Sequence, residues 1–186
     1  MADGSQHEFL SRSDVIVASY HGKVVPKMPT ELVLALSLLL ACSTASAQDY
    51  NIPDHARTPG TINQHVTQDN AALTVCVAGW TRTIRPTSSY TSRLKAQQLR
   101  ALHLPGSARD YEEDHLVPLC VGGHPTDHRN LWPQPRRGRW SAKIKDQLEA
   151  SVCRAVCRGA MTLEEGRAIF LRPDWTKEYV KFFGLE

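Results

Sequence analysis

The apolar positions of the chain first gather at residues 32–42, a run that is apolar except for Ser37 and that Ala-Ser-Ala follows at 45–47. Basic residues before such a run and small residues after it are typical of a secretory signal, and the run is too short for a stable transmembrane helix. We therefore expect a signal peptide at residues 28–47. The polar, patternless residues 1–27 are interpreted as an over-extended reading frame or a disordered leader.

Beyond the signal, the pattern predicts an arm, a strand and a helix. Residues 48–72 are rich in Pro, Asn, Gln and Thr without an apolar period, which favours an extended arm. In residues 73–84, β-branched side chains alternate with others, so we expect a strand or a bulged hairpin. A helix capped by Thr91 or Ser92 is expected to continue to Leu102.

Three further helical patterns follow later in the chain. Apolar residues recur every fourth position within residues 141–158, which predicts a helix facing the core. Thr162 and Glu165 form a capping box that opens the next helix, and a short helix with an aromatic side is expected after Pro173. Residues 73–186 are thus expected to form one α+β domain.

The stretch at residues 111–135 carries the most chemically active group of side chains. Asp114 and His115 are adjacent, a short apolar segment and a Gly-Gly turn follow, and Asn130 comes fifteen residues after the histidine. Adjacent side chains on a strand point to opposite faces. The Asp-His pair can therefore serve one site only where the strand is bulged or ends, and we expect such a distortion here.

Composition adds a mildly basic charge. The whole chain has 22 basic and 19 acidic residues, and residues 48–186 hold 19 and 15 of them, a net charge of +4. This balance is compatible with a polyanionic partner and does not establish one by itself.

The five cysteines agree with export. Cys42 lies in the apolar run, where Leu-Leu-Ala-Cys also fits a bacterial lipoprotein box, so a lipid anchor at Cys42 is an alternative to cleavage after the signal. The other four cysteines form an even set, which predicts two disulfides in an oxidising compartment. A zinc site built from these thiols and histidines is the competing interpretation, but no Cys-x-x-Cys pair exists.

The spacing of the cysteines restricts their pairing. Cys153 and Cys157 lie four residues apart on a predicted helix, whose geometry suits a mutual bridge poorly. Each is therefore expected to pair with a cysteine elsewhere. The favoured pairs are Cys76 with Cys157 and Cys120 with Cys153, and the exchanged pairing stays open.

Asp114 and His115 have the chemistry that phosphodiester hydrolysis requires. A histidine can activate a water molecule because its pKa lies near neutral pH. A carboxylate can hold a hard divalent cation, which stabilises the charge of the transition state and the departing oxygen.

These residues carry a resemblance to a known family. The order Asp114-His115-Leu-Val-Pro-Leu, Gly122-Gly123, Asn130-Leu-Trp-Pro and Lys145-Asp146-x-Leu-Glu149 resembles the HNH endonucleases of the ββα-metal class. More narrowly, it resembles small exported bacterial HNH-type proteins, over a region from about residue 59 to residue 175. The resemblance implies an α+β fold with a ββα-metal (HNH-like) core and additional helices.

The resemblance also implies roles for individual residues. Asp114 matches the first metal ligand, His115 the general base, and Asn130 the residue that braces the histidine loop. The family's further ligand, at the start of the helix, falls here on Ser141, and Asp146 or a water held by Ser141 would complete the shell. The expected ion is Mg²⁺, with Mn²⁺, Zn²⁺ or Ni²⁺ as alternatives.

Basic and aromatic residues suggest how nucleic acid would bind. Arginine side chains can hold phosphates and tryptophan rings can stack on bases. The candidates are Arg82, Arg85, Arg136, Arg137, Arg139 and Trp140. The competing interpretation is that these arginines belong to an ordinary solvated face and a basic loop.

The sequence thus predicts a metal-dependent endonuclease of low sequence specificity, acting on nucleic acid, DNA in preference to RNA, and leaving a 5′ phosphate. The mature protein is expected to be periplasmic or secreted and to lack a transmembrane span, and its oligomeric state is open. One alternative is a catalytically inactive HNH-like domain that binds nucleic acid or other polyanions. Another is a small disulfide-stapled structural protein.

Overall fold

The computed structural model describes residues 50–185, which belong to one compact unit, Ala47–Glu186. The expected leader, signal peptide and lipid attachment site at Cys42 lie outside the described residues. No helix within residues 50–185 has both the length and the apolar character needed to cross a membrane.

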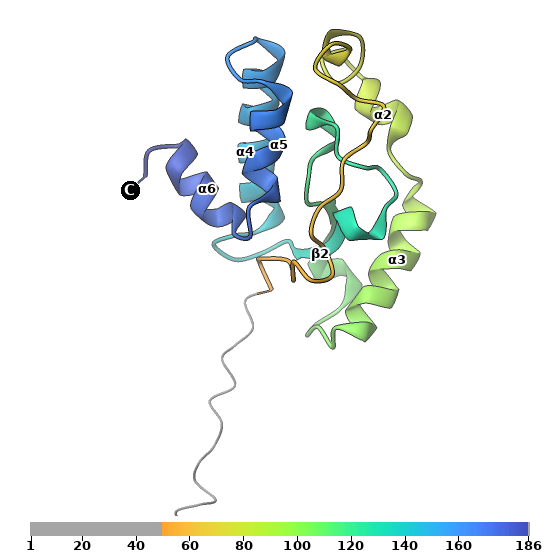
Figure 1. Ribbon diagram of the computed structural model, residues 1–186. Helices are drawn as coiled ribbons and strands as arrows, with labels where there is room; N and C mark the ends of the chain where they lie inside the picture. Colours follow the sequence, from red (N-terminus) through yellow and green to blue (C-terminus); the bar gives the residue numbers. More distant parts are fainter. Residues whose placement is uncertain (1–49, 186) are drawn as a thin grey trace, which may run out of the picture. The chain divides into compact units, whose positions relative to one another are not determined.

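The described chain is a mixed α+β fold, which confirms the expected class (Figure 1). Its helices and strands, in chain order, are α2 (Trp80–Ile84), α3 (Ser88–Ala101), β1 (Tyr111–His115), β2 (Leu131–Pro135), α4 (Ala142–Cys157), α5 (Leu163–Leu171) and α6 (Trp175–Phe182). Four short 3₁₀ turns join them, namely η1 (Ala71–Leu73), η2 (Ala108–Asp110), η3 (Leu119–Val121) and η4 (His128–Asn130).

The two strands form an antiparallel hairpin in which Asp114 pairs with Trp132 and His115 with Leu131. The backbone N–H of Leu116 donates to the Asn130 carbonyl just beyond this pairing. Hydrogen-bonded pairs alternate along an antiparallel ladder, so Pro133 and Pro135 fall at positions whose nitrogen points away from β1. The two prolines therefore remove no hydrogen bond from the hairpin.

Three outward backbone carbonyls of the hairpin are bound by side chains from the two helices that flank it. From α3, Lys95 donates to the Tyr111 carbonyl and Gln98 to the Leu131 carbonyl, at 2.9 and 2.8 Å. From α4, Lys145 donates to the His115 carbonyl at 2.7 Å. Figure 1 shows α3 on one side of the hairpin and α4, α5 and α6 on the other.

The C-terminal helices agree with the sequence pattern. The predicted helix at 141–158 is α4, which buries Ala142, Lys145, Leu148, Val152 and Val156. The capping box of Thr162 and Glu165 is present at the start of α5. The aromatic helix is α6, and its Trp175 is completely buried in the core with Phe170 of α5.

The prediction of a strand at residues 73–84 is wrong. This segment contains the end of η1, a series of turns and the short helix α2, which Gly79 precedes with a φ of 83°. β-propensity mainly reflects packing on a pleated surface. The segment instead leaves Leu73 and Val77 exposed, and it is fixed to α4 through Cys76.

Helix α3 begins earlier than the sequence predicts. The expected cap was Thr91 or Ser92, whereas the cap is Thr87, whose side chain accepts a hydrogen bond from the Tyr90 backbone N–H. Thr87 and several Ser and Thr residues of the first turns lie close together in the sequence, and each of these residue types can serve as a cap. The predicted C-terminal boundary at Leu102 agrees with the observed helix, whose C-cap is Leu102.

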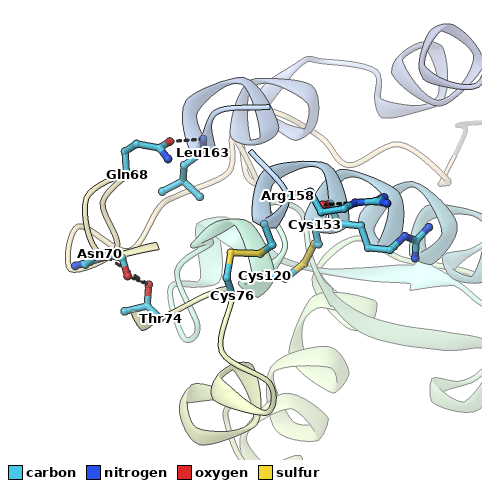
Figure 2. Close-up of a disulfide and its surroundings, with 10 residues drawn as sticks. Gln68, Asn70, Thr74, Cys76, Cys120, Cys153, Arg158 and Leu163 are labelled. Carbon is cyan, nitrogen blue, oxygen red and sulfur yellow. Dashed lines mark hydrogen bonds between the residues drawn. A yellow bond between two sulfur atoms is a disulfide. The ribbon is translucent and has the colours of Figure 1, made fainter. Parts of the chain in front are cut away.

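Both disulfides join α4 to segments elsewhere in the chain. Cys157 pairs with Cys76, and Cys153 pairs with Cys120 of η3, the arrangement that the sequence favoured. Figure 2 shows the two bridges next to each other on the same side of α4. They attach α4 to the segment before α2 and to the loop that follows His115.

Candidate functional site

Asn130 holds the loop between the two strands. Its Oδ1 accepts hydrogen bonds from the backbone N–H groups of Val117 and Thr61, at 2.9 and 3.4 Å. Its Nδ2 donates to the carbonyls of Val117 and His124, each at 3.0 Å. The completely buried amide thus makes four hydrogen bonds, its usual full set, and joins the two ends of the loop.

The close approach of the loop to itself requires glycine at position 123. A Cβ added to Gly123 would lie 1.8 Å from the Val117 carbonyl oxygen and 3.0 Å from Nδ2 of Asn130. No side chain fits at that distance from backbone. The Gly-Gly turn of the sequence therefore allows the contacts that Asn130 makes.

His115 is the last residue of β1, and only 4% of its surface is exposed. Its Nε2 lies 2.9 Å from the Pro125 carbonyl oxygen. A carbonyl only accepts, so Nε2 carries the proton and Nδ1 keeps its lone pair. Burial lowers the pKa of His115, and this outweighs the opposite effects of the Pro125 carbonyl and the Asp114 carboxylate. The imidazole is therefore neutral at pH 7 and able to accept a proton.

Asp114 faces α4 and forms an ion pair with Lys145. The Nζ atom of Lys145 lies 2.7 Å from Oδ2 of Asp114, and it also contacts Glu149 one turn further along α4. The Asp114 side chain keeps 16% of its surface exposed. Its Oδ1 accepts no hydrogen bond from residues 50–185, so this oxygen is available to a ligand.

Burial and the neighbouring charges both shift the pKa values of Lys145 and Glu149. Burial alone would lower the pKa of Lys145, but the carboxylates of Asp114 and Glu149 outweigh it and raise that pKa, so the lysine is charged. Burial raises the pKa of Glu149, and Lys145 opposes this rise.

Two more carboxylates lie near Asp114. The pKa of Asp146 is raised, first by burial and then by the negative charges of Asp114 and Glu112. Mutual repulsion of this kind is relieved when a cation binds, which suits a hard divalent ion with oxygen ligands. Arg85 lies close enough to lower the pKa of both Asp146 and His115.

Ser141, where the resemblance puts a further metal ligand, stands immediately before the first residue of α4. Ser141 is the buried N-cap of α4, and its side chain makes no capping hydrogen bond. Among residues 50–185, no three His, Cys, Asp or Glu side chains form a group that could hold a metal ion. Protein ligands for a cation would therefore come from Asp114 together with Asp146, with water in the remaining positions.

The candidate nucleic-acid-binding arginines lie in three places. Arg82 is exposed on α2, and Arg85 follows that helix at the His115 end of the hairpin. Arg136 pairs with Glu112 at 2.8 Å, at the opposite end of the hairpin. Arg137 lies near Asp110 and helps to lower its pKa, behind the larger effects of hydrogen bonds from Ser107. The candidate site thus has basic groups at both ends.

Trp140 packs against the C-terminal helices. Its ring meets those of Trp175 and Tyr179 edge to face, with centroids 6.0 and 5.7 Å apart. Arg139 lies over the Trp140 ring at 5.0 Å. Part of the ring therefore contacts the core, and the arginine covers one face of it.

Lys145 and Glu149 are the residues to which the sequence analysis gave no role. A signal for them was present, because Lys145 precedes Leu148 by three positions and Val152 by seven, which puts it on the buried side of a helix. A buried lysine requires carboxylate partners, and Glu149 stands at the neighbouring i+4 position.

A pocket of about 450 Å³ lies away from the Asp114 group. Residues of the arm, the C-terminal end of α3 and β2 line it, among them Ile52, Leu102 and Trp132. None of Asp114, His115 and Lys145 is in its lining. The charged groups described above therefore define the candidate site, and this pocket does not contribute to it.

Among known proteins, no family model, no curated protein and no solved structure matches the chain.

Proposed function

We propose that the protein is a metal-dependent endonuclease of the HNH type, in which β1, β2 and α4 correspond to the ββα-metal core. The observation that carries the proposal is the state of His115. Its Nε2 proton is engaged by the Pro125 carbonyl, its Nδ1 lone pair is available, and its pKa is lowered. A buried neutral imidazole at the end of a strand, beside a carboxylate with an open oxygen, suits a general base.

In this proposal Nδ1 of His115 takes a proton from the water that attacks the phosphate. The hydrogen bond to Pro125 keeps the ring in the required tautomer and orientation. Asn130 supports the same arrangement because it holds both ends of the loop that contains Pro125. The 3′ oxygen leaves, and the product carries a 5′ phosphate.

Asp114 would hold the metal ion through Oδ1, with Asp146 nearby as a second carboxylate. The repulsion among Asp114, Asp146 and Glu112 supports this assignment, because a cation would relieve it. When bound, a Mg²⁺ ion would stabilise the negative charge of the transition state and of the departing oxygen. Arg85 and Arg136 at the two ends of the hairpin would contact phosphates on either side of the scissile bond.

A second candidate function is binding of nucleic acid or another polyanion without cleavage. The ion pair between Lys145 and Asp114 favours it, because the lysine already neutralises one carboxylate oxygen. The number of protein ligands available to a metal is also small.

The two candidates predict different results with plasmid DNA. The purified protein is incubated with supercoiled plasmid and Mg²⁺ or Mn²⁺, beside a His115→Ala variant and a control, His65→Ala, whose side chain is exposed in the arm. The proposal expects nicking by the wild type and His65→Ala, and a loss of at least a hundredfold in His115→Ala. Parallel reactions with single-stranded DNA and RNA would define the substrate.

Plasmid binding without cleavage, under either metal and with a folded protein, would contradict the nuclease proposal and support the polyanion-binding one. Equal cleavage by wild type and His115→Ala would remove the histidine from the mechanism.

A further inference from the structure

Lys145 is an unusual residue for the middle of a helix, because no part of it is exposed. Its ammonium group has three protons and three acceptors, namely Oδ2 of Asp114, the backbone carbonyl of His115 and a carboxylate oxygen of Glu149. Every donor is therefore used inside the protein. Lys145 cannot touch a substrate in this arrangement, so its role must be exerted through its partners.

The contacts of Lys145 converge on the two residues of the candidate site. One contact fixes a carboxylate oxygen of Asp114 and another fixes the backbone at His115, both at 2.7 Å. A carboxylate group is planar and rigid, so the position of Oδ2 restricts the position of Oδ1. The Lys145 side chain thereby determines where Oδ1 of Asp114 lies.

Glu149 balances the charge that Lys145 brings. Without Glu149, the lysine and Asp114 would together be neutral, and a divalent cation would find little attraction there. When Glu149 is ionised in its ion pair with Lys145, Asp114, Lys145 and Glu149 together have a net charge of −1. The i+4 spacing on α4 puts Glu149 in contact with the ammonium group.

We propose that Lys145 is a positioning residue, which holds Asp114 for cation binding, and that Glu149 preserves the negative charge of the group. The inference rests on the proposed function, because it assumes that Asp114 binds the metal ion. Metal ligands held in place by a second layer of contacts commonly lose ten- to a hundredfold in affinity when that layer is removed.

The test measures Mn²⁺ binding by calorimetry, in parallel with thermal unfolding followed by circular dichroism. Lys145→Met/Glu149→Met removes the support for Asp114 and leaves the net charge of the group unchanged. Its Mn²⁺ dissociation constant is expected to rise at least tenfold. Glu149→Gln keeps the lysine and makes the group neutral, so a rise of at least threefold is expected.

Two reference variants complete the set. Glu178→Gln in α6 is the matched control, since Glu178 pairs with Arg172 and its side chain is 19% exposed, as that of Glu149 is. It should bind Mn²⁺ as the wild type does. Asp114→Asn should abolish binding and so locate the ion.

The outcomes distinguish the metal site at Asp114 from the positioning role of Lys145. A lower melting temperature of the double variant with an unchanged dissociation constant would show a structural role only and overturn the inference, while the metal site at Asp114 would stand. If the double variant does not fold, Glu149→Gln decides, and unchanged binding overturns the inference. A wild type that binds no Mn²⁺ overturns both the metal site and this inference.

Discussion

The carboxylates on the two faces of the hairpin differ in whether they have a positively charged partner. Toward α4, the carboxylate of Asp114 meets the ammonium group of Lys145 at 2.7 Å, and Glu149 completes the group. Toward α3, both carboxylate oxygens of Glu113 are buried without a hydrogen-bond partner. Burial raises the pKa of Glu113 to about 8, with Lys95 opposing and Asp114 adding to the rise.

The difference shows how a fixed counter-charge affects a partly buried carboxylate. On the α4 face the lysine holds one carboxylate oxygen of Asp114 in an ion pair and leaves the other open, which the proposed cation binding requires. On the α3 face Glu113 has no ion pair within residues 50–185, and burial outweighs the charge of Lys95, so Glu113 is protonated at neutral pH. Adjacent carboxylates on one strand therefore have different surroundings because they point to different helices.

The largest expected effect comes from Lys145→Met, which would make the α4 face resemble the α3 face. Removing one partner of a buried ion pair leaves uncompensated charge, so the free energy of unfolding should fall by about 3–5 kcal/mol. Urea unfolding measures this loss. Lys143→Met, two positions earlier and exposed, is the control and should change stability by less than about 0.5 kcal/mol. A loss in Lys145→Met as small as that of the control would mean that the ion pair contributes nothing.

The second-largest effect is expected when the disulfide between Cys120 and Cys153 of α4 is removed. Cys120→Ala/Cys153→Ala removes the bridge between α4 and the loop after His115, whose cysteines are 33 residues apart. Loop-closure entropy predicts a loss of about 3–4 kcal/mol in the free energy of unfolding. The Lys145 contacts remain, so Mn²⁺ affinity below the melting temperature should change less than twofold. A large loss of affinity would show that the bridge, and not the lysine, positions Asp114.

The smallest effect is expected from Glu113→Gln on the α3 face. In the unfolded chain Glu113 ionises near pH 4.5, and in the folded protein near pH 8. Between these values the folded protein retains a proton that the unfolded chain has released, so wild-type stability should decrease as pH rises. The variant lacks this decrease and should be about 1 kcal/mol more stable at pH 8, because a buried amide without partners keeps part of the desolvation cost.

Urea unfolding of the wild type and Glu113→Gln at pH 4.5 and pH 8, in EDTA, measures the difference. EDTA prevents metal binding at the neighbouring Asp114 from adding its own pH dependence. Parallel stability curves for the two proteins would contradict the assignment of a raised pKa to Glu113.

The parts of the fold that local patterns determine were predicted correctly. The ladder of α4, the capping box of α5 and the aromatic helix α6 each follow from residues within two turns of one another. The end of β1 at His115 also agrees with the expectation that the Asp-His pair lies where a strand ends. Whether the site cleaves nucleic acid stays a prediction.

The parts that depend on tertiary contacts were not predictable in the same way. Residues 73–84 have the composition of a strand, but the sheet of the described chain is formed by β1 and β2 without them. The burial of the Lys145 ammonium group depends on Asp114, which lies 31 positions away in the sequence. Sequence periodicity does not reveal that contact.

The prolines of β2 have a consequence for the protein outside its own fold. An unpaired strand edge with free N–H groups can recruit a strand from another chain, which leads to aggregation or strand exchange. Pro133 and Pro135 stand where outward N–H groups would be, and Gln98 of α3 already binds the outward carbonyl of Leu131. Pro133 and Pro135 thus offer an incoming strand no N–H donors and the Leu131 carbonyl is already occupied, so pairing of another strand along this edge of β2 is disfavoured.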